Sequence, residues 1–199
     1  DREVARVDDV PLPGRHNLEN AVAALTMMYA GRFDWDRTLD ALRAFRGVEH
    51  RIEHVLELDG VDFYNDSKST NVDSLRVALE SFERPVVLIA GGQGKGSRYD
   101  GLRDLMQQHA KTLITLGEEA PALEEAFGNL LPTQRATDMA DAVTRAHRAA
   151  TADDVVLLSP ACASFDMYDN FEARGRDYKA CVQRLAVSAG RDDDTEAPT

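Results

Sequence analysis

The sequence predicts an α/β fold in which helices flank a mostly parallel sheet. From residue 61 onward, short apolar runs that suit buried strands alternate with segments whose apolar residues recur at helical spacing. Single helices between consecutive strands imply right-handed crossovers, which place neighbouring strands parallel. The dipeptide Asp59-Gly60 separates two further strand-like runs, 53–58 and 61–64, and indicates an opening β-hairpin. The expected architecture is Rossmann-like, preceded by a short helical remnant of another domain.

The first part of the chain is helical by pattern. After an irregular segment, 1–13, apolar residues recur at helical spacing over 17–30 and again over 36–45. Asn17 is a suitable N-cap for the first of these helices. The pattern breaks at Gly47, so we expect a domain boundary just before that residue.

Beyond this boundary, strands and helices alternate up to residue 187. We expect strands at 53–58, 61–64, 86–90, 112–116, 133–136 and 155–158, and helices at 72–82, 99–109, 120–127, 139–150 and 170–186. The last segment, 188–199, is rich in Asp and Thr, and we expect a disordered acidic tail there.

The bulk composition excludes several classes of function. A chain of 199 residues with 43% hydrophobic residues can form a substantial core. The net charge of −12 disfavours binding to nucleic acid or to an anionic membrane, and no apolar run has the length of a membrane span. Because only two cysteines occur, Cys162 and Cys181, we expect no disulfide framework and a reduced, cytoplasmic protein.

Two polar loops follow predicted strands. An unbroken polar run, 65–71, comes after the strand that ends at Tyr64, and a glycine-rich run, 91–97, comes after strand 86–90. Ligands gather at the carboxyl ends of parallel strands, so both loops are expected to face a ligand. Lys68 and Lys95 lie in these loops and are two of only four lysines in the chain. A compact positive charge in each loop favours an anionic ligand.

Other familiar site patterns are absent from the sequence. Lys95 is followed by Gly96, where a phosphate loop needs Ser or Thr. Cys162 has no cation beside it and is expected to be a small buried filler. Ser164 lacks the nucleophile-elbow pattern. No set of histidines and cysteines has the spacing of zinc ligands, and we predict no metal site within the chain.

Several motifs together, in one order, closely resemble the Mur ligase family. The resemblance covers nearly the whole chain, from about Pro11 to Ala186, and the diaminopimelate-type motif Asp-Asn-Pro-Arg is absent. The run Ser-Pro-Ala-Cys-Ala-Ser favours the members that add D-glutamate. The motifs are Gly14-x-His16-Asn17-x-x-Asn20, His50-Arg51, Asn65-Asp66-Ser67-Lys68-Ser69-Thr70-Asn71, Gly91-Gly92-x-Gly94-Lys95 and Leu158-Ser159-Pro160-Ala161-Cys162-Ala163-Ser164-Phe165-Asp166.

The resemblance implies an ATP-dependent amide ligase of peptidoglycan synthesis. Such an enzyme adds D-glutamate to UDP-N-acetylmuramoyl-L-alanine through an acyl phosphate. By resemblance, residues 1–46 form the C-terminal end of the central ATPase domain, and residues 47–187 form the Mur ligase C-terminal domain. The phosphate loop and the magnesium ligands belong to the rest of the polypeptide. We therefore expect the isolated chain to be inactive.

The resemblance also assigns roles to individual residues. Lys68 and Lys95 are the expected catalytic cations. The expected nucleotide-binding residues are Asn17 and Asn20 at adenine, His50 and Arg51 at the hinge, Asp66 at ribose and Lys68 near the phosphates. Those expected to bind D-glutamate are Thr70, Lys95, Ser164, Phe165 and Phe171.

Two alternatives remain open from the sequence. The chain could be a stand-alone module that binds an acidic ligand or a protein without performing chemistry. It could also belong to a ligase that resembles folylpolyglutamate synthetase, which shares the domain plan. A likeness of fold alone does not separate these readings from a D-glutamate ligase.

Overall fold

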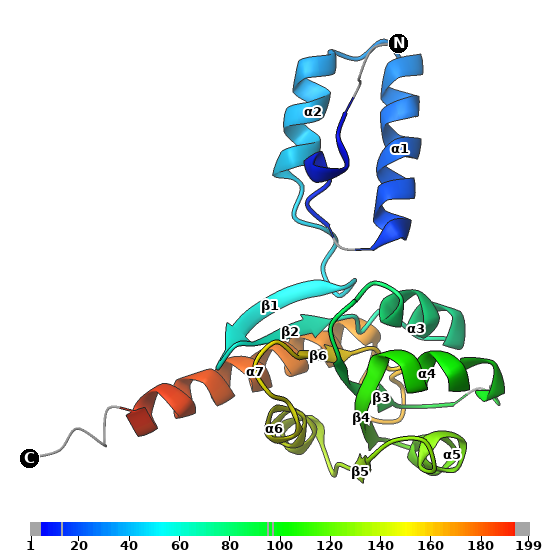
Figure 1. Ribbon diagram of the computed structural model, residues 1–199, viewed down its shortest axis with the longest axis vertical. Helices are drawn as coiled ribbons and strands as arrows, with labels where there is room; N and C mark the ends of the chain where they lie inside the picture. The colour runs from blue at the N-terminus through cyan, green and yellow to red at the C-terminus, as the bar shows by residue number, and fades with distance from the viewer. Residues whose placement is uncertain (1–4, 13, 95, 97, 194–199) are drawn as a thin grey trace, which may run out of the picture. The chain divides into compact units, whose positions relative to one another are not determined.

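The computed structural model describes residues 5–12, 14–94, 96 and 98–193 (Figure 1). The chain divides into two compact units, Asp1–Val48 and Glu49–Thr199, which we call unit 1 and unit 2. This division lies close to the boundary expected before Gly47. Lys95 falls outside the described residues.

Unit 1 is a small helical unit with little buried apolar surface. It contains the 3-10 helix η1 (Val7–Asp9) and the helices α1 (Arg15–Ala30) and α2 (Trp35–Ala44). Asp34 caps α2, because its side chain accepts a hydrogen bond from the Arg37 amide at 2.9 Å. Within these three helices only Ala21 and Thr38 are buried.

The start of α1 differs from the expected N-cap at Asn17. Gly14, at φ +93°, precedes the helix, which begins at Arg15 and places Asn17 inside its first turn. Glycine adopts this positive φ without the steric cost that a larger residue would meet. The helix therefore begins at an earlier residue than the expected N-cap at Asn17 would place it.

Unit 2 is a parallel α/β sheet with one antiparallel edge strand. Its described strands follow the order β1-β2-β6-β3-β4-β5, in which only β1 and β2 are antiparallel. Their bounds are β1 (Glu53–Leu58), β2 (Val61–Asn65), β3 (Val86–Gly91), β4 (Ala110–Leu116), β5 (Thr133–Arg135) and β6 (Val155–Leu158). The hairpin between β1 and β2 turns at Asp59 and Gly60, both with positive φ, as the sequence predicted.

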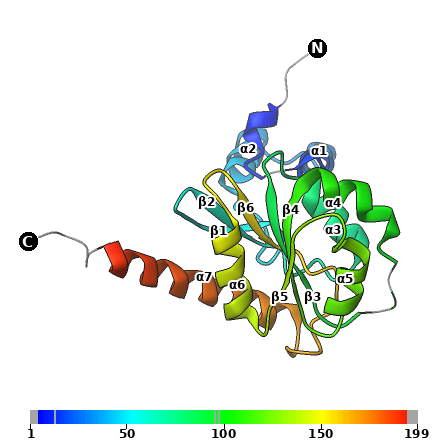
Figure 2. The same cartoon turned by 60° about the horizontal axis from the view of Figure 1, so that its bottom comes forward.

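Helices cover both faces of this sheet, as Figures 1 and 2 show. One face packs against α3 (Val72–Leu79), the 3-10 helix η2 (Asp100–Leu102) with α4 (Arg103–His109), and α5 (Ala120–Phe127). The other packs against α6 (Met139–Ala149) and α7 (Phe171–Asp193). Alternate residues of β3 face opposite cores, Leu88 toward the first and Ile89 toward the second. The predicted α/β architecture is thus confirmed.

The last helix is longer than the sequence predicted. It was expected to end near residue 186, before a disordered tail at 188–199, but α7 continues to Asp193. The Ser188 hydroxyl donates to the Arg184 carbonyl at 3.0 Å, and no proline occurs before Pro198 to stop the helix. Residues 194–199 lie outside the described part. Of the helices described, none is long and apolar enough to cross a membrane.

Candidate functional site

The loops that follow β2 and β6 meet at the carboxyl edge of the sheet. Asn65 and Leu158 are paired across these strands, and the Asp66 amide donates to the Leu158 carbonyl at 2.8 Å. The Asp66 carboxylate accepts from the Ser159 hydroxyl at 2.9 Å and from the Ile52 amide at 3.2 Å. Only 5% of Asp66 is exposed, and this burial raises its pKa to about 7. Asp66 therefore links three segments rather than facing solvent.

A tight turn presents Arg51 at the start of unit 2. His50 and Ile52 have φ values of +66° and +44°, a left-handed conformation that a β-branched residue rarely adopts. The turn is held because the His50 amide donates to Glu53 at 2.9 Å and the Lys68 amide donates to the His50 carbonyl at 3.0 Å. Arg51, between the two strained residues, is exposed. The surrounding hydrogen bonds thus fix the backbone that carries this cation.

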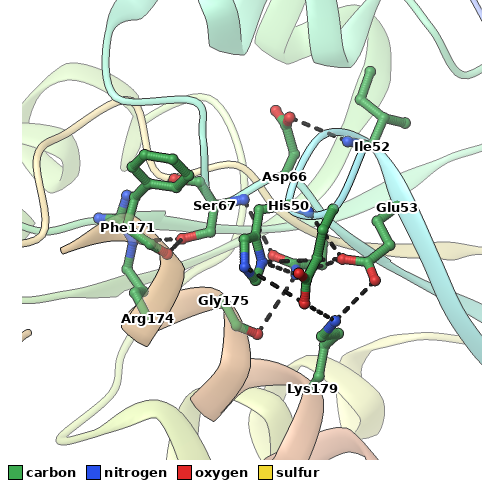
Figure 3. A network of polar contacts seen from close by, with 11 residues as sticks. His50, Ile52, Glu53, Asp66, Ser67, Phe171, Arg174, Gly175 and Lys179 are labelled. Carbon is green, nitrogen blue, oxygen red and sulfur yellow. Dashed lines mark hydrogen bonds and ion pairs between the residues drawn. The ribbon is translucent and has the colours of Figure 1, made fainter. Parts of the chain in front are cut away.

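The His50 side chain is buried among other residues of unit 2 (Figure 3). The Asn65 amide nitrogen lies 2.9 Å from His50 Nδ1 and also donates to Glu53 at 3.0 Å. The ring packs edge-on to Phe171, with 6.1 Å between centroids, and only a glycine at position 175 leaves room for it. Burial lowers the pKa of His50, which favours the neutral ring.

Lys179 closes the network beside His50 (Figure 3). Its ammonium contacts Glu49 at 2.7 Å and Glu53 at 2.9 Å. Glu49, His50 and Glu53 are grouped closely enough to offer ligands to a metal ion. The lysine ammonium bridges both carboxylates, so this cluster is better described as a salt-bridge network than as a metal centre.

Lys68 and Phe171, which the sequence placed far apart, lie together. Lys68 Nζ is 5.5 Å from the centre of the Phe171 ring, a cation–π contact, and Lys68 is exposed. The Ser67 hydroxyl donates to the Phe171 carbonyl at 2.8 Å and fixes the start of α7 to the loop after β2. Two of the expected site residues therefore share one surface.

The glycine run after β3 is joined to the loop after β6. Gln93 and Ala163 exchange two backbone hydrogen bonds, at 2.9 and 3.1 Å. Gly91 and Gly92 have φ values near +130°, and a side chain at Gly91 would collide with the Leu116 carbonyl. Lys95, within this run, lies outside the described residues, so its side chain is not placed.

The remaining expected residues fall into two groups. Ser164 follows the Gln93–Ala163 bridge and is buried, Phe165 is 66% exposed, and Thr70 is half-buried. Asn17 and Asn20 lie on α1 of unit 1, and each unit is described by itself. Cys162 is buried, as predicted for a small filler, and burial raises the pKa of its thiol to about 11.

The sequence did not single out Arg174. On a helix, an arginine normally indicates a solvated face, yet this residue is only 2% exposed. It donates hydrogen bonds to both Ser67 and the Cys162–Ala163 segment. Gly175, the next residue, provided the only local signal, since a glycine inside a helix indicates close packing.

Comparisons with known proteins identify relatives of this chain. The family described as "Mur ligase, glutamate ligase domain" matches residues 50–162. The UDP-N-acetylmuramoylalanine–D-glutamate ligase of Clostridioides difficile is 46% identical over 180 residues, which cover 89% of this chain and 40% of that protein. The ligase of the same name from Pseudomonas fluorescens is 46% identical over 184 residues, covering 90% and 41%. The chain thus spans about two fifths of the length of these relatives.

Solved structures share the fold at low sequence identity. The UDP-N-acetylmuramate–alanine ligase of Thermotoga maritima is 18% identical with a TM-score of 0.64, over 89% of this chain and 39% of that one. Folylpolyglutamate synthase of Mycobacterium tuberculosis is also 18% identical, with a TM-score of 0.63 over 85% and 41%. The match over residues 50–162, supported by the curated relatives, establishes that the chain belongs to the Mur ligase family, through its glutamate ligase domain.

Proposed function

We propose that this chain is the amino-acid- and nucleotide-binding part of an ATP-dependent ligase that adds D-glutamate to UDP-N-acetylmuramoyl-L-alanine. The observation that carries the proposal is the joining of three loops at one sheet edge. The loop after β2 contacts α7 through Lys68 and Phe171, and the glycine run is bonded to the loop that bears Ser164. Residues expected to act on one anionic ligand therefore come from segments that are bonded to one another.

D-Glutamate is the ligand proposed for this edge. Thr70, Ser164, Phe165 and Phe171 would surround it, with Lys95 supplying a charge for one of its carboxylates. The relatives that are 46% identical carry the name of the D-glutamate ligase. The folylpolyglutamate synthase shares only the fold, at 18% identity, and is the weaker alternative.

The nucleotide would approach from the side of Arg51 and Lys68. Both cations are exposed. The segments that carry them are connected by the hydrogen bond from the Lys68 amide to the His50 carbonyl. The two cations are suited to the phosphates, and Asn17 and Asn20 are proposed to bind adenine. The folylpolyglutamate synthase of Mycobacterium tuberculosis and the MurF ligase of Thermotoga maritima, which share this fold, were both solved with ADP bound. For His50 and Asp66, burial favours an indirect role, in which they hold the turn that presents Arg51.

The proposed reaction joins a carboxylate to an amine. ATP would phosphorylate the carboxylate of UDP-N-acetylmuramoyl-L-alanine, and the D-glutamate amine would attack the acyl carbon. A C–N bond forms, phosphate leaves and the amine loses a proton. Lys68 and Arg51 would stabilise the negative charge that develops on the transferred phosphoryl group.

Magnesium is expected to accompany ATP in this reaction, but the described residues do not fit it. The grouped ligands around His50 include an imidazole and are bridged by Lys179, whereas Mg²⁺ prefers oxygen ligands in an octahedron. We therefore place the magnesium ligands elsewhere in the polypeptide.

The domain assignment is part of the same proposal. Residues 1–46 would belong to the end of the central ATPase domain, residues 47–187 would form the C-terminal domain, and the remaining polypeptide would be the partner. The isolated chain would then be inactive. Both cysteines are free and buried, which suits the proposed cytoplasmic location.

A chimera tests the function directly. The matching segment of the Clostridioides difficile ligase is replaced by this chain, and phosphate release is measured with UDP-N-acetylmuramoyl-L-alanine and ATP. We expect release that depends on D-glutamate and is much slower with L-glutamate. A folded chimera that releases phosphate equally with either glutamate, or with neither, would overturn the proposal.

A further inference from the structure

Arg174 occupies the centre of the candidate site without reaching its surface. Its guanidinium is buried, and each nitrogen donates to an oxygen of a loop at the carboxyl edge of the sheet. Nε donates to the Ser67 hydroxyl at 3.0 Å, and Nη2 donates to the Ser67 carbonyl at 2.8 Å. Nη1 donates to the Cys162 and Ala163 carbonyls at 3.1 and 3.2 Å. One side chain thus joins the loop after β2 to the loop after β6.

The glycine run after β3 also adjoins this guanidinium. A Cβ at Gly92 would lie 3.0 Å from Arg174 Nη1, so the absence of a side chain there makes room for the arginine. Gln93, the residue after Gly92, is held to the loop after β6 by its backbone bridge to Ala163. Arg174 therefore adjoins three loops, and its own helix begins with Phe171.

The geometry suits arginine better than lysine. A guanidinium is planar and sends five N–H groups in fixed directions, whereas an ammonium offers three donors from one point. The four acceptors that Arg174 uses carry no formal charge, so the guanidinium forms hydrogen bonds with them and no ion pair. Burial lowers the pKa of Arg174 to about 10, and the residue remains a cation at neutral pH.

We propose that Arg174 is a positioning residue, which sets the placement of Lys68 and Phe171 relative to Ser164. The inference rests on the proposed function, because it takes D-glutamate as the ligand of that edge. Ser67 contributes to the same task, since its hydroxyl accepts from Arg174 and donates to the Phe171 carbonyl. A site must be held within a fraction of an ångström to bind well, and one side chain here connects the parts.

The test compares variants of the 199-residue chain by titration with D-glutamate, followed by NMR. Arg174→Lys keeps the positive charge but loses the planar guanidinium with its several N–H donors, and we expect it to bind D-glutamate roughly 10- to 100-fold more weakly. Ser67→Ala, which retains the whole arginine, is a milder variant and should weaken binding in the same direction. Arg176→Lys, an exposed position on the same helix, serves as the matched control and should bind as the unmodified chain does.

Amide hydrogen exchange separates positioning from general destabilisation. In Arg174→Lys and in Ser67→Ala we expect faster exchange at the Gln93 and Ala163 amides, with little change at the amides of Leu88 and Leu157 in the strands. Uniform loss of protection would show that Arg174 only stabilises the fold, and unchanged binding in Arg174→Lys would overturn its positioning role. If the unmodified chain fails to bind D-glutamate while the local exchange pattern appears, the proposed function fails and the link between the loops stands.

Discussion

The Asp66 carboxylate accepts a hydrogen bond from the Ser159 hydroxyl at 2.9 Å. This contact joins the ends of β2 and β6, neighbouring strands whose loops form the candidate site. Ser159 is completely buried, and Asp66 nearly so. The negative charge therefore lies where water does not stabilise it, and the two hydrogen bonds to Asp66 compensate only in part.

The pKa of Asp66 predicts a specific dependence of stability on pH. Burial raises this pKa to about 7 in the folded chain, whereas an unfolded aspartate titrates near 3.9. Between these values the folded state holds a proton that the unfolded state has lost, so the contribution of Asp66 to stability falls as pH rises. In urea unfolding between pH 4 and pH 8, Asp66→Asn should remove this decline and gain stability relative to the unmodified chain toward pH 8. An identical slope in both proteins would contradict the burial argument.

Gly175 is expected to be intolerant of a methyl group. A Cβ at this position would collide with the His50 ring, although alanine is by itself the better helix former. The collision should outweigh the gain in propensity, and Gly175→Ala should lower the free energy of unfolding by about 1–3 kcal/mol. Gly101→Ala is the control, because its nearest neighbour would be Arg76 at 3.6 Å, an ordinary contact. Equal stability of the two variants would show that His50 is free to move aside.

Unit 1 should exchange its amide hydrogens faster than unit 2. Its helices bury few side chains, and Val22, Met27, Tyr29 and Phe33 are each more than half exposed. Helical stability in proteins comes chiefly from packing of an apolar face, and little of that packing exists within this unit. Exchange followed by mass spectrometry checks the prediction. Equal protection in α1 and in the strands of unit 2 would mean that another surface covers these helices.

Lys95→Ala should chiefly impair the use of D-glutamate. In the chimera with the Clostridioides difficile ligase, a charge-assisted contact worth on the order of 1.5–3 kcal/mol corresponds to roughly 10- to 150-fold in kcat/KM. The loss should appear mainly in KM, since the carboxylate persists from ground state to transition state. Arginine should rescue poorly, because a planar guanidinium does not reproduce the compact charge of an ammonium. Arg98→Ala, a highly exposed cation nearby in sequence, is the control. A rise confined to the KM for ATP would assign Lys95 to the nucleotide.

The fold was accessible from the sequence because its signals are local. Apolar runs such as Val155–Leu158 and the Asp59-Gly60 turn specify strands and hairpin independently of distant residues. The end of α7 was missed, since Asp- and Thr-rich composition suggested disorder although no proline stops the helix. Local pattern thus predicts where elements occur better than where they end.

The site was predictable only in part, because burial depends on distant contacts. The polar run 65–71 lies at the end of β2, at the carboxyl edge of the sheet, as the sequence predicted, but the pattern did not reveal that Asp66 is buried while Lys68 is exposed. Arg174 was missed for the same reason, since its partners lie more than ten residues away in sequence or on another loop. The burial of Asp66 and Arg174 results from tertiary packing, which the spacing of residues in the sequence does not reveal.

The most direct measurement is the NMR map of D-glutamate binding to the chain itself. Labelled chain is titrated with D-glutamate to millimolar concentration, with L-glutamate as the matched control. We predict saturable shifts centred on the amides of Thr70, Ser164 and Phe171, and much weaker effects from the L isomer. Shifts of equal size with both isomers, shifts centred elsewhere in the described residues, or no shifts at all would contradict the assignment of this edge to D-glutamate.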